Sequence, residues 1–224
     1  MVASALKNLS GWENDILFSS GVSNSGEQNE INFHREIELV KLYLEKITNP
    51  ASFVYFSTTS IFDPLKKHSS YILHKLKIEK LIKASERNFL IIRLPNLVGF
   101  SSNPNTLTNF FADSIRLERK IQLNRSAIRH LIDVADLSLI LNDLKGIYGN
   151  KKITVNVETD KPLSADLILN LLEEILLKKA FVQPISESAE LKGYENDLNI
   201  SSIKYIWKTK EDYHKNLLKK YYSI

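Results

Sequence analysis

The chain has 224 residues, of which 43% are hydrophobic and 25% charged, with a formal net charge of +4 and no cysteine. This is the composition of an ordinary globular protein, and it excludes disulfides and thiolate metal sites. No apolar run approaches the roughly eighteen residues of a membrane span, and the lysines alternate with acidic residues, so we expect neither a membrane helix nor a nucleic-acid-binding surface.

The first half of the chain alternates short apolar strands with amphipathic helices. We expect strands at residues 15–21, 53–57 and 89–93, and helices at 32–47 and 69–85. Strands that alternate with helices of this length indicate βαβ units and a parallel sheet with right-handed connections.

After Gly99 the predicted elements become shorter and more mixed. We expect helices at 106–118, 134–145, 164–178 and 209–222, and strands at 120–123, 129–132, 153–157 and near Phe181. This change of pattern predicts a smaller mixed α/β lobe beside the parallel sheet.

One pair of residues has the spacing of a proton-transfer site. Tyr71 and Lys75 are one helical turn apart, which places them on the same face of the helix expected at 69–85. An ammonium close to a phenol favours the phenolate and lowers the tyrosine pKa. The spacing alone has little specificity, and its alternative interpretation is a helix tyrosine beside a surface lysine.

The residues around this pair resemble the motifs of one enzyme family. Four segments carry the resemblance: residues 53–62, which end a strand in hydroxyl residues, the Tyr71–Lys75 turn, Ile92–Gly99, and Arg129–Asp136. A tail, Leu198 to Lys204 followed by Trp207, is similar as well. In this order they resemble the extended short-chain dehydrogenases/reductases, the NAD(P)-dependent nucleotide-sugar epimerases, dehydratases and reductases. The Pro95-Asn96 pair and the short loop after Ser19 are most similar to the sugar-nucleotide reductase and capsule-sugar branch.

The resemblance implies a fold class and a division of the chain. The fold is expected to be a truncated Rossmann-like, doubly wound parallel sheet with a smaller mixed α/β substrate lobe. Residues 1–100 would form a partial NAD(P)-binding region, and residues 101–224 would form mainly the lobe. A segment at about 130–160 would return to the main sheet.

The resemblance also assigns roles to individual residues. Tyr71 would be the general acid/base, and Lys75 would lower the Tyr71 pKa and bind the nicotinamide ribose. Thr58 would polarise the substrate oxygen, with Thr59 as the neighbouring alternative and a substrate-binding residue. A cluster of strand-end capping hydroxyls is the alternative interpretation of this segment.

Further positions would bind the two ligands. The residues expected at the cofactor, besides Tyr71 and Lys75, are Ser19, Ser20, Gly21 and Pro95. Asn96 and Arg129 would bind the nucleotide-sugar, since a guanidinium can bond bidentately to a diphosphate. An ion pair with Asp133 is the alternative for Arg129. No histidine or acidic residue has the spacing of a metal ligand set, so we expect no metal site.

The sequence departs from the family at the glycine-rich turn. None of its seven glycines forms the Gly-x-x-Gly-x-x-Gly spacing with which the family holds the cofactor pyrophosphate. Residues 4–9 resemble the end of the helix that precedes the fourth family strand, so the chain resembles a member without its first three strands. A truncated product, a second chain that supplies the missing half, and a homologue that has lost catalysis are the three explanations.

The expected function is therefore an oxidoreductase that uses NAD or NADP on a nucleotide-linked sugar, in polysaccharide biosynthesis. We expect a homodimer formed through helices 32–47 and 69–85, as in the family. The absence of cysteine and of a basic-then-apolar start in residues 1–8 indicates a cytoplasmic protein. The alternative is a catalytically impaired homologue that acts as a binding or dimerisation module.

Overall fold

The computed structural model describes residues 1–7, 9–63, 66–149, 151–184 and 202–223. Its main sheet has five strands, all paired in parallel, in the order β1-β2-β3-β8-β11. Their bounds are β1 Ile16–Phe18, β2 Ser52–Thr58, β3 Asn88–Leu94, β8 Ile153–Thr159 and β11 Ile203–Trp207. This arrangement confirms the α/β fold class and the parallel pairing expected of the first three strands.

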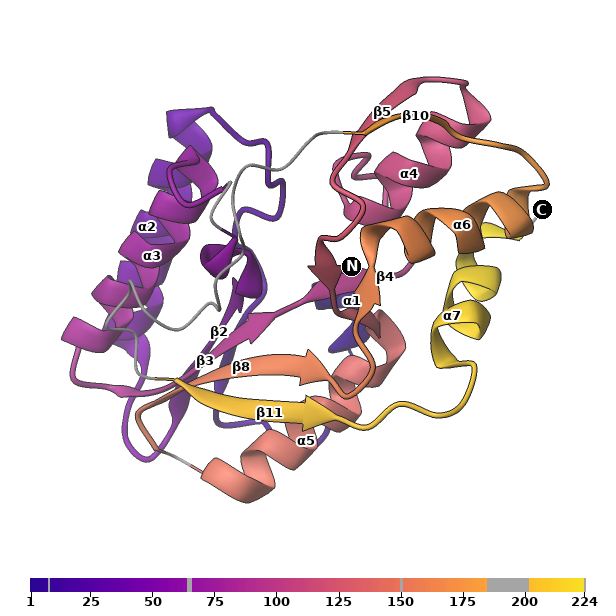
Figure 1. Cartoon of the computed structure of the whole chain (residues 1–224). Coiled ribbons are helices and arrows are strands. Elements are labelled where there is room, and N and C mark those ends of the chain that lie inside the picture. The colour runs from indigo at the N-terminus through magenta and orange to yellow at the C-terminus, as the bar shows by residue number, and fades with distance from the viewer. Residues whose placement is uncertain (8, 64–65, 150, 185–201, 224) are drawn as a thin grey trace.

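Helices α2 (Glu30–Lys46) and α3 (Ser70–Ala84) cover one face of the main sheet (Figure 1). Their apolar stripes pack on alternate side chains of the strands, and this core includes Val40, Ile78, Phe53 and Ile91. Each helix begins at a side-chain cap, because Asn29 accepts a hydrogen bond from the N–H of Ile31 and Ser69 accepts one from that of Ile72.

Helices α1 (Val2–Ala5) and α5 (Leu137–Tyr148) lie on the opposite face (Figure 1). The strand side chains that point to this face alternate with those that face α2 and α3. Val54 and Ile92 are among them, and they pack in one core with Leu141 of α5. The inner strands are therefore apolar on both faces, as in other parallel sheets covered by helices on both sides.

A smaller lobe has its own apolar core beside the main sheet (Figure 1). Its helices are α4 (Leu107–Arg116), α6 (Ala165–Leu176) and α7 (Tyr213–Tyr222), and its parallel strand pair is β5 (Lys120–Leu123) with β10 (Phe181–Pro184). Two short pairs join the lobe to the sheet: β4 (Asn96–Val98) with β7 (Leu131–Asp133), and β6 (Ile128–Arg129) with β9 (Leu163–Ser164).

Some elements differ from the expectations. The strand expected at 129–132 is divided into β6 and β7, because Ile128–Arg129 pairs antiparallel with β9 whereas Leu131–Asp133 pairs in parallel with β4. Strand β11 was not expected, and α7 begins four residues later than the predicted helix, after Asp212 with its φ of 54°. Residues 198–201 of the tail motif lie outside the described residues.

A buried ion pair joins helix α3 to the strands of the main sheet. Arg93 of β3 is 0% exposed and bonds Glu79 of α3 through two nitrogens, at 3.0 and 2.6 Å. Ser57 of β2 donates to the same carboxylate at 2.7 Å, and Arg93 donates to Asn156 of β8 at 3.3 Å. This network ties α3 to three adjacent strands.

Within the described residues, no helix combines the length and apolarity needed to cross a membrane.

Candidate active site

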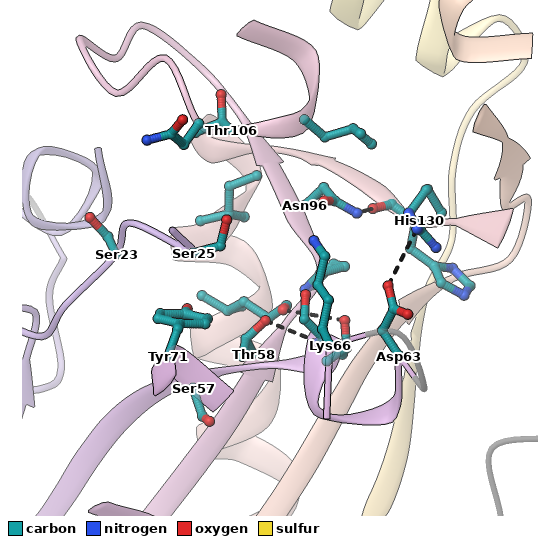
Figure 2. Close-up of a pocket in the computed structure, with 18 of the residues that line it drawn as sticks. Ser23, Ser25, Ser57, Thr58, Asp63, Lys66, Tyr71, Asn96, Thr106 and His130 are labelled. Carbon is teal, nitrogen blue, oxygen red and sulfur yellow. Dashed lines mark hydrogen bonds and ion pairs between the residues drawn. The ribbon is translucent and has the colours of Figure 1, made fainter. Parts of the chain in front are cut away.

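A cavity of about 1050 Å³ opens at the carboxyl ends of the main strands, where the lobe faces the sheet (Figure 2). Its walls come from the ends of β1, β2 and β3, from α3, from the start of α4 and from β6. Ligands of open parallel sheets bind at this edge, because the loops after the strands leave a crevice there. The cavity has the size of a site for a cofactor or substrate.

Thr58 and Tyr71 meet on one wall of this cavity (Figure 2). Thr58 is the last residue of β2, and its side chain caps the following turn by accepting from the N–H of Ser60 at 3.0 Å. Tyr71 stands in the first turn of α3 and is hydrogen-bonded to the Thr58 side chain. The two hydroxyls predicted to act together therefore lie within one hydrogen bond of each other.

The environment of Tyr71 holds its phenol protonated. Burial and the negative charge of Glu36 raise the pKa of Tyr71 above its ordinary value, and the hydrogen bond with Thr58 acts in the opposite direction. The net shift of the Tyr71 pKa is therefore opposite to the one expected from Lys75, because burial and the charge of Glu36 outweigh any stabilisation of the phenolate by the ammonium.

Lys75 makes its hydrogen bonds to groups other than the Tyr71 hydroxyl. Its ammonium donates to the hydroxyl of Tyr55 at 2.9 Å and to Glu36 Oε1 at 3.3 Å. It lies 4.9 Å from the ring centroid of Tyr55 and 5.8 Å from that of Tyr71, both within cation–π range. Lys75 is thus buried in an ion pair and not exposed on a lysine-rich helix surface.

Glu36 of α2 is the carboxylate at the centre of this cluster, and it is 0% exposed. It accepts from the N–H of Val22 at 2.6 Å and from the hydroxyl of Tyr55 at 2.7 Å, and His74 Nε2 lies 2.9 Å from it. Burial favours the neutral acid, but the bonds from His74, the charge of Lys75 and the other donors together lower the pKa of Glu36 to about 2. The carboxylate is therefore charged throughout the physiological range.

This pKa predicts an acid-dependent loss of stability. The folded-state pKa of Glu36 lies below its ordinary 4.5, so its stabilisation is complete above that value and is lost as the pH falls toward 2. The amount is about 3 kcal/mol, from about 1.4 kcal/mol per pKa unit. Urea unfolding at pH 6, 4 and 3 should show the difference between the unmodified protein and Glu36→Gln becoming smaller as the pH falls. A difference that stays constant would contradict this.

The structure brings most of the predicted site residues to the one cavity. Besides Thr58, Tyr71 and Lys75, the predicted residues that line it are Ser19, Gly21, Thr59, Pro95, Asn96 and Arg129. Ser20 is the exception: it is exposed, it is not part of the cavity wall, and its carbonyl accepts from Arg35 at 3.1 Å.

Two of the three residues predicted to bind substrate, Arg129 and Asn96, are held by partners in this structure. Arg129 pairs with Asp63 at 3.4 Å, and not with Asp133, which instead bonds Lys220 at 2.8 Å. The Asn96 amide donates to the carbonyl of His130 at 3.2 Å. The Arg129–Asp63 pair lies at the end of the cavity away from Tyr71 (Figure 2).

Sequence reasoning missed Glu36, Tyr55 and His74. A signal for Glu36 was present, because it lies among Phe33 and Val40 on the apolar face of the predicted helix, where a charged residue needs a partner. Nothing local to Tyr55 distinguishes it from the other apolar residues of its strand.

The described residues hold no group of three histidine, cysteine, aspartate or glutamate side chains that could bind a metal. Tyr71, Lys75 and Gly21, which the resemblance assigns to the nicotinamide half of a dinucleotide, line the same cavity. A glycine-rich turn for the pyrophosphate is not found among the glycines of the sequence.

No protein-family model matches this sequence, and no curated protein matches it significantly. Solved structures do share its fold. UDP-glucuronic acid 4-epimerase from Bacillus cereus, in complex with NAD, superposes with a TM-score of 0.65 and 14% identity over 99% of this chain and 74% of that chain. The structure of dTDP-4-dehydrorhamnose reductase from Bacillus anthracis, in complex with NADP, superposes with a TM-score of 0.62 and 14% identity over 99% of this chain and 84% of that chain.

UDP-N-acetylglucosamine 4-epimerase from Methanobrevibacter ruminantium, in complex with UDP-N-acetylmuramic acid, gives a TM-score of 0.60 and 17% identity over 92% of this chain and 73% of that chain. At these identities the likeness shows the fold. The chain therefore has the Rossmann-like α/β fold of these structures, and the fold class expected from its sequence is confirmed.

Proposed function

We propose that this chain is an NAD(P)-dependent oxidoreductase of the epimerase, dehydratase or reductase type, acting on a nucleotide-linked sugar. The observation that carries the proposal is the meeting of Thr58, Tyr71 and Lys75 on one cavity wall, at the carboxyl edge of a parallel sheet. The solved structures that share the fold support it, since their complexes contain NAD, NADP or a UDP-linked sugar.

Tyr71 moves the proton in this proposal. The Tyr71 phenol carries its proton at neutral pH and would give it to a sugar carbonyl oxygen. Thr58 holds the Tyr71 hydroxyl and would hydrogen-bond the same oxygen. In the reverse direction, the charge of Lys75 stabilises the phenolate that accepts a proton from a sugar hydroxyl. A bound nicotinamide dinucleotide would supply the hydride exchange.

Other cavity residues would orient the two ligands. Ser19, Gly21 and Pro95 would line the cofactor end together with Lys75. Thr59, Asn96 and Arg129 would bind the nucleotide-sugar, with the Arg129 guanidinium exchanging Asp63 for a phosphate of the diphosphate. Production of a cytoplasmic sugar precursor for polysaccharide synthesis is the role that this chemistry fits.

The proposal is tested by measuring cofactor binding directly. Titration with NADH and with NADPH, followed by calorimetry and by melting temperature, should give saturable binding and a melting temperature that rises with ligand concentration. A panel of UDP- and dTDP-linked sugars with the better cofactor then identifies the reaction. An absence of binding by both cofactors would overturn the proposal for this chain.

We further propose that two copies associate through α2 and α3. Apolar side chains lie exposed on the outer surfaces of both helices: Ile31 is 75% exposed, Leu42 43% and Leu73 53%. Ile31 and Leu42 share one stripe of α2, because eleven residues make about three helical turns. A second copy that packs on this surface would remove these side chains from water.

Charge introduced on this surface should separate the dimer. The double variant Leu42→Glu/Leu73→Glu is expected to halve the mass measured by light scattering, since each copy would have to bury carboxylates at the interface. Leu139→Glu is the matched control, because Leu139 is 55% exposed on α5, on the other face of the sheet. A monomeric unmodified protein, or a double variant that stays dimeric, would contradict the prediction.

A binding or assembly module is the second candidate. The observation that favours it is the edge of the sheet: among the described strands β1 pairs with β2 alone, which leaves its other side open to a further parallel strand. The two candidates differ in the cofactor titration, since a module that has lost catalysis would assemble without binding NADH.

A further inference from the structure

Several titratable protein groups surround Lys75 where it lines the cavity. Glu36 of α2, Tyr55 of β2, and Tyr71, His74 and Glu79 of α3 are the titratable groups that face it. Glu79 is already bound to Arg93 by two hydrogen bonds. Among these groups, Glu36 is therefore the one negative charge within hydrogen-bond distance of the ammonium, at 3.3 Å.

The charge of Lys75 depends on this neighbour. Lys75 is 2% exposed, and burial lowers its pKa below the ordinary value. The charge of Glu36 and its hydrogen bond act in the opposite direction. A buried ammonium without a compensating carboxylate tends to lose its proton, and neutral lysine has no charge to offer a phenolate.

Gly21 permits the chain to close over this pair. A Cβ at position 21 would lie 2.7 Å from Glu36 Oε1, closer than side chains approach without displacement, and 3.1 Å from Lys75 Nζ, a tight contact. The next residue, Val22, donates its N–H to Glu36 at 2.6 Å. The same carboxylate therefore anchors the turn after β1 and the lysine, which line one end of the cavity.

We propose that Glu36 is a positioning residue of this site, which keeps Lys75 protonated and holds it, together with the Gly21 turn, at the cofactor end of the cavity. Its importance for catalysis rests on the proposed function, whereas its effect on Lys75 is a property of the folded chain. Glu36 acts through Lys75 and is not itself part of the cavity wall.

The proton equilibrium of Lys75 can be measured without any ligand. Protein labelled with ¹³C at the lysine Cε carbons is titrated by NMR, and the Lys75 signal is assigned by its absence from Lys75→Arg. In Glu36→Gln the midpoint of this signal is expected to fall by about one pH unit or more, because the favourable charge is removed from a buried site. Glu38→Gln is the matched control, since Glu38 lies on α2 but is exposed and pairs with Lys41.

An unchanged Lys75 midpoint in folded Glu36→Gln would overturn the proposal. Should Glu36→Gln fail to fold, Glu36→Asp keeps the charge but withdraws it by one methylene. A smaller downward movement of the midpoint is then expected, and an unchanged midpoint overturns the proposal here too.

A second arm uses activity. Lys75 is charged below its midpoint, so the alkaline limb of the kcat/KM profile should move to lower pH in Glu36→Gln and return part of the way in Glu36→Asp. A purely structural role for Glu36 would lower activity without moving this limb. Absence of turnover in the unmodified protein would count against the proposed function alone, because the NMR titration would still report on Glu36.

Discussion

Replacing Tyr71 with phenylalanine should reduce turnover by at least about 10²–10⁴-fold, the usual contribution of a general acid/base. The variant loses one oxygen atom and keeps the ring, so the wall of the cavity and the packing against Ile72 and Ile61 should persist. Cofactor affinity should change little, because Lys75 and Gly21 remain in place. The measurement is kcat with the best sugar substrate, together with the NADH dissociation constant.

Tyr148→Phe is the control for this experiment. Tyr148 ends α5 and packs in the core on the opposite face of the sheet, so removal of its hydroxyl should leave kcat unchanged. Turnover by Tyr71→Phe that equals the control would show that Tyr71 carries no proton, and the assignment of the site would then be wrong.

Removal of Glu79 should cause a large loss of stability. Glu79→Ala leaves the Arg93 guanidinium buried with no carboxylate partner, and breaking a buried pair in this way typically costs about 3–5 kcal/mol. It also removes the acceptor of the Ser57 hydroxyl, which lies beside Thr58. Urea denaturation of the variant measures the change in unfolding free energy.

Two further variants make this prediction specific. Glu174→Ala removes an exposed carboxylate that pairs with Lys215, and a surface pair of this kind contributes about 0–1 kcal/mol. The double variant Arg93→Met/Glu79→Leu removes both buried charges and should recover much of the stability lost by Glu79→Ala. A single variant that loses no more than the surface control would contradict the assigned role of the pair.

Local patterns in the sequence were sufficient for the main elements. The strand at residues 53–57 and the helix at 69–85 follow from β-branched and apolar runs and from helical spacing, and the structure places them at Ser52–Thr58 and Ser70–Ala84. Boundaries moved where the pairing of strands intervened, as at His130, where the predicted strand divides into β6, which pairs with β9, and β7, which pairs with β4.

The composition of the site was predictable in part. Tyr71 and Lys75 are neighbours along one helix, and Thr58 ends the strand before it, so chain order alone brought these three residues into consideration. The partners of Lys75 were not predictable in this way. Glu36 is 39 residues from Lys75 in the sequence and lies on helix α2, and Tyr55 lies on strand β2.

The sequence by itself determined the alternation of strands and helices and the proton-transfer motif, because both depend on the period of the backbone over a few residues. Only the tertiary structure decided the charges around that motif: Glu36 with Lys75, Glu79 with Arg93, and Asp63 with Arg129. These pairs join separate elements, so their formation depends on how the helices pack on the sheet. A buried charge takes whichever partner that packing brings within reach, and this is why Tyr71 has a raised pKa beside a lysine that its spacing predicted would lower it.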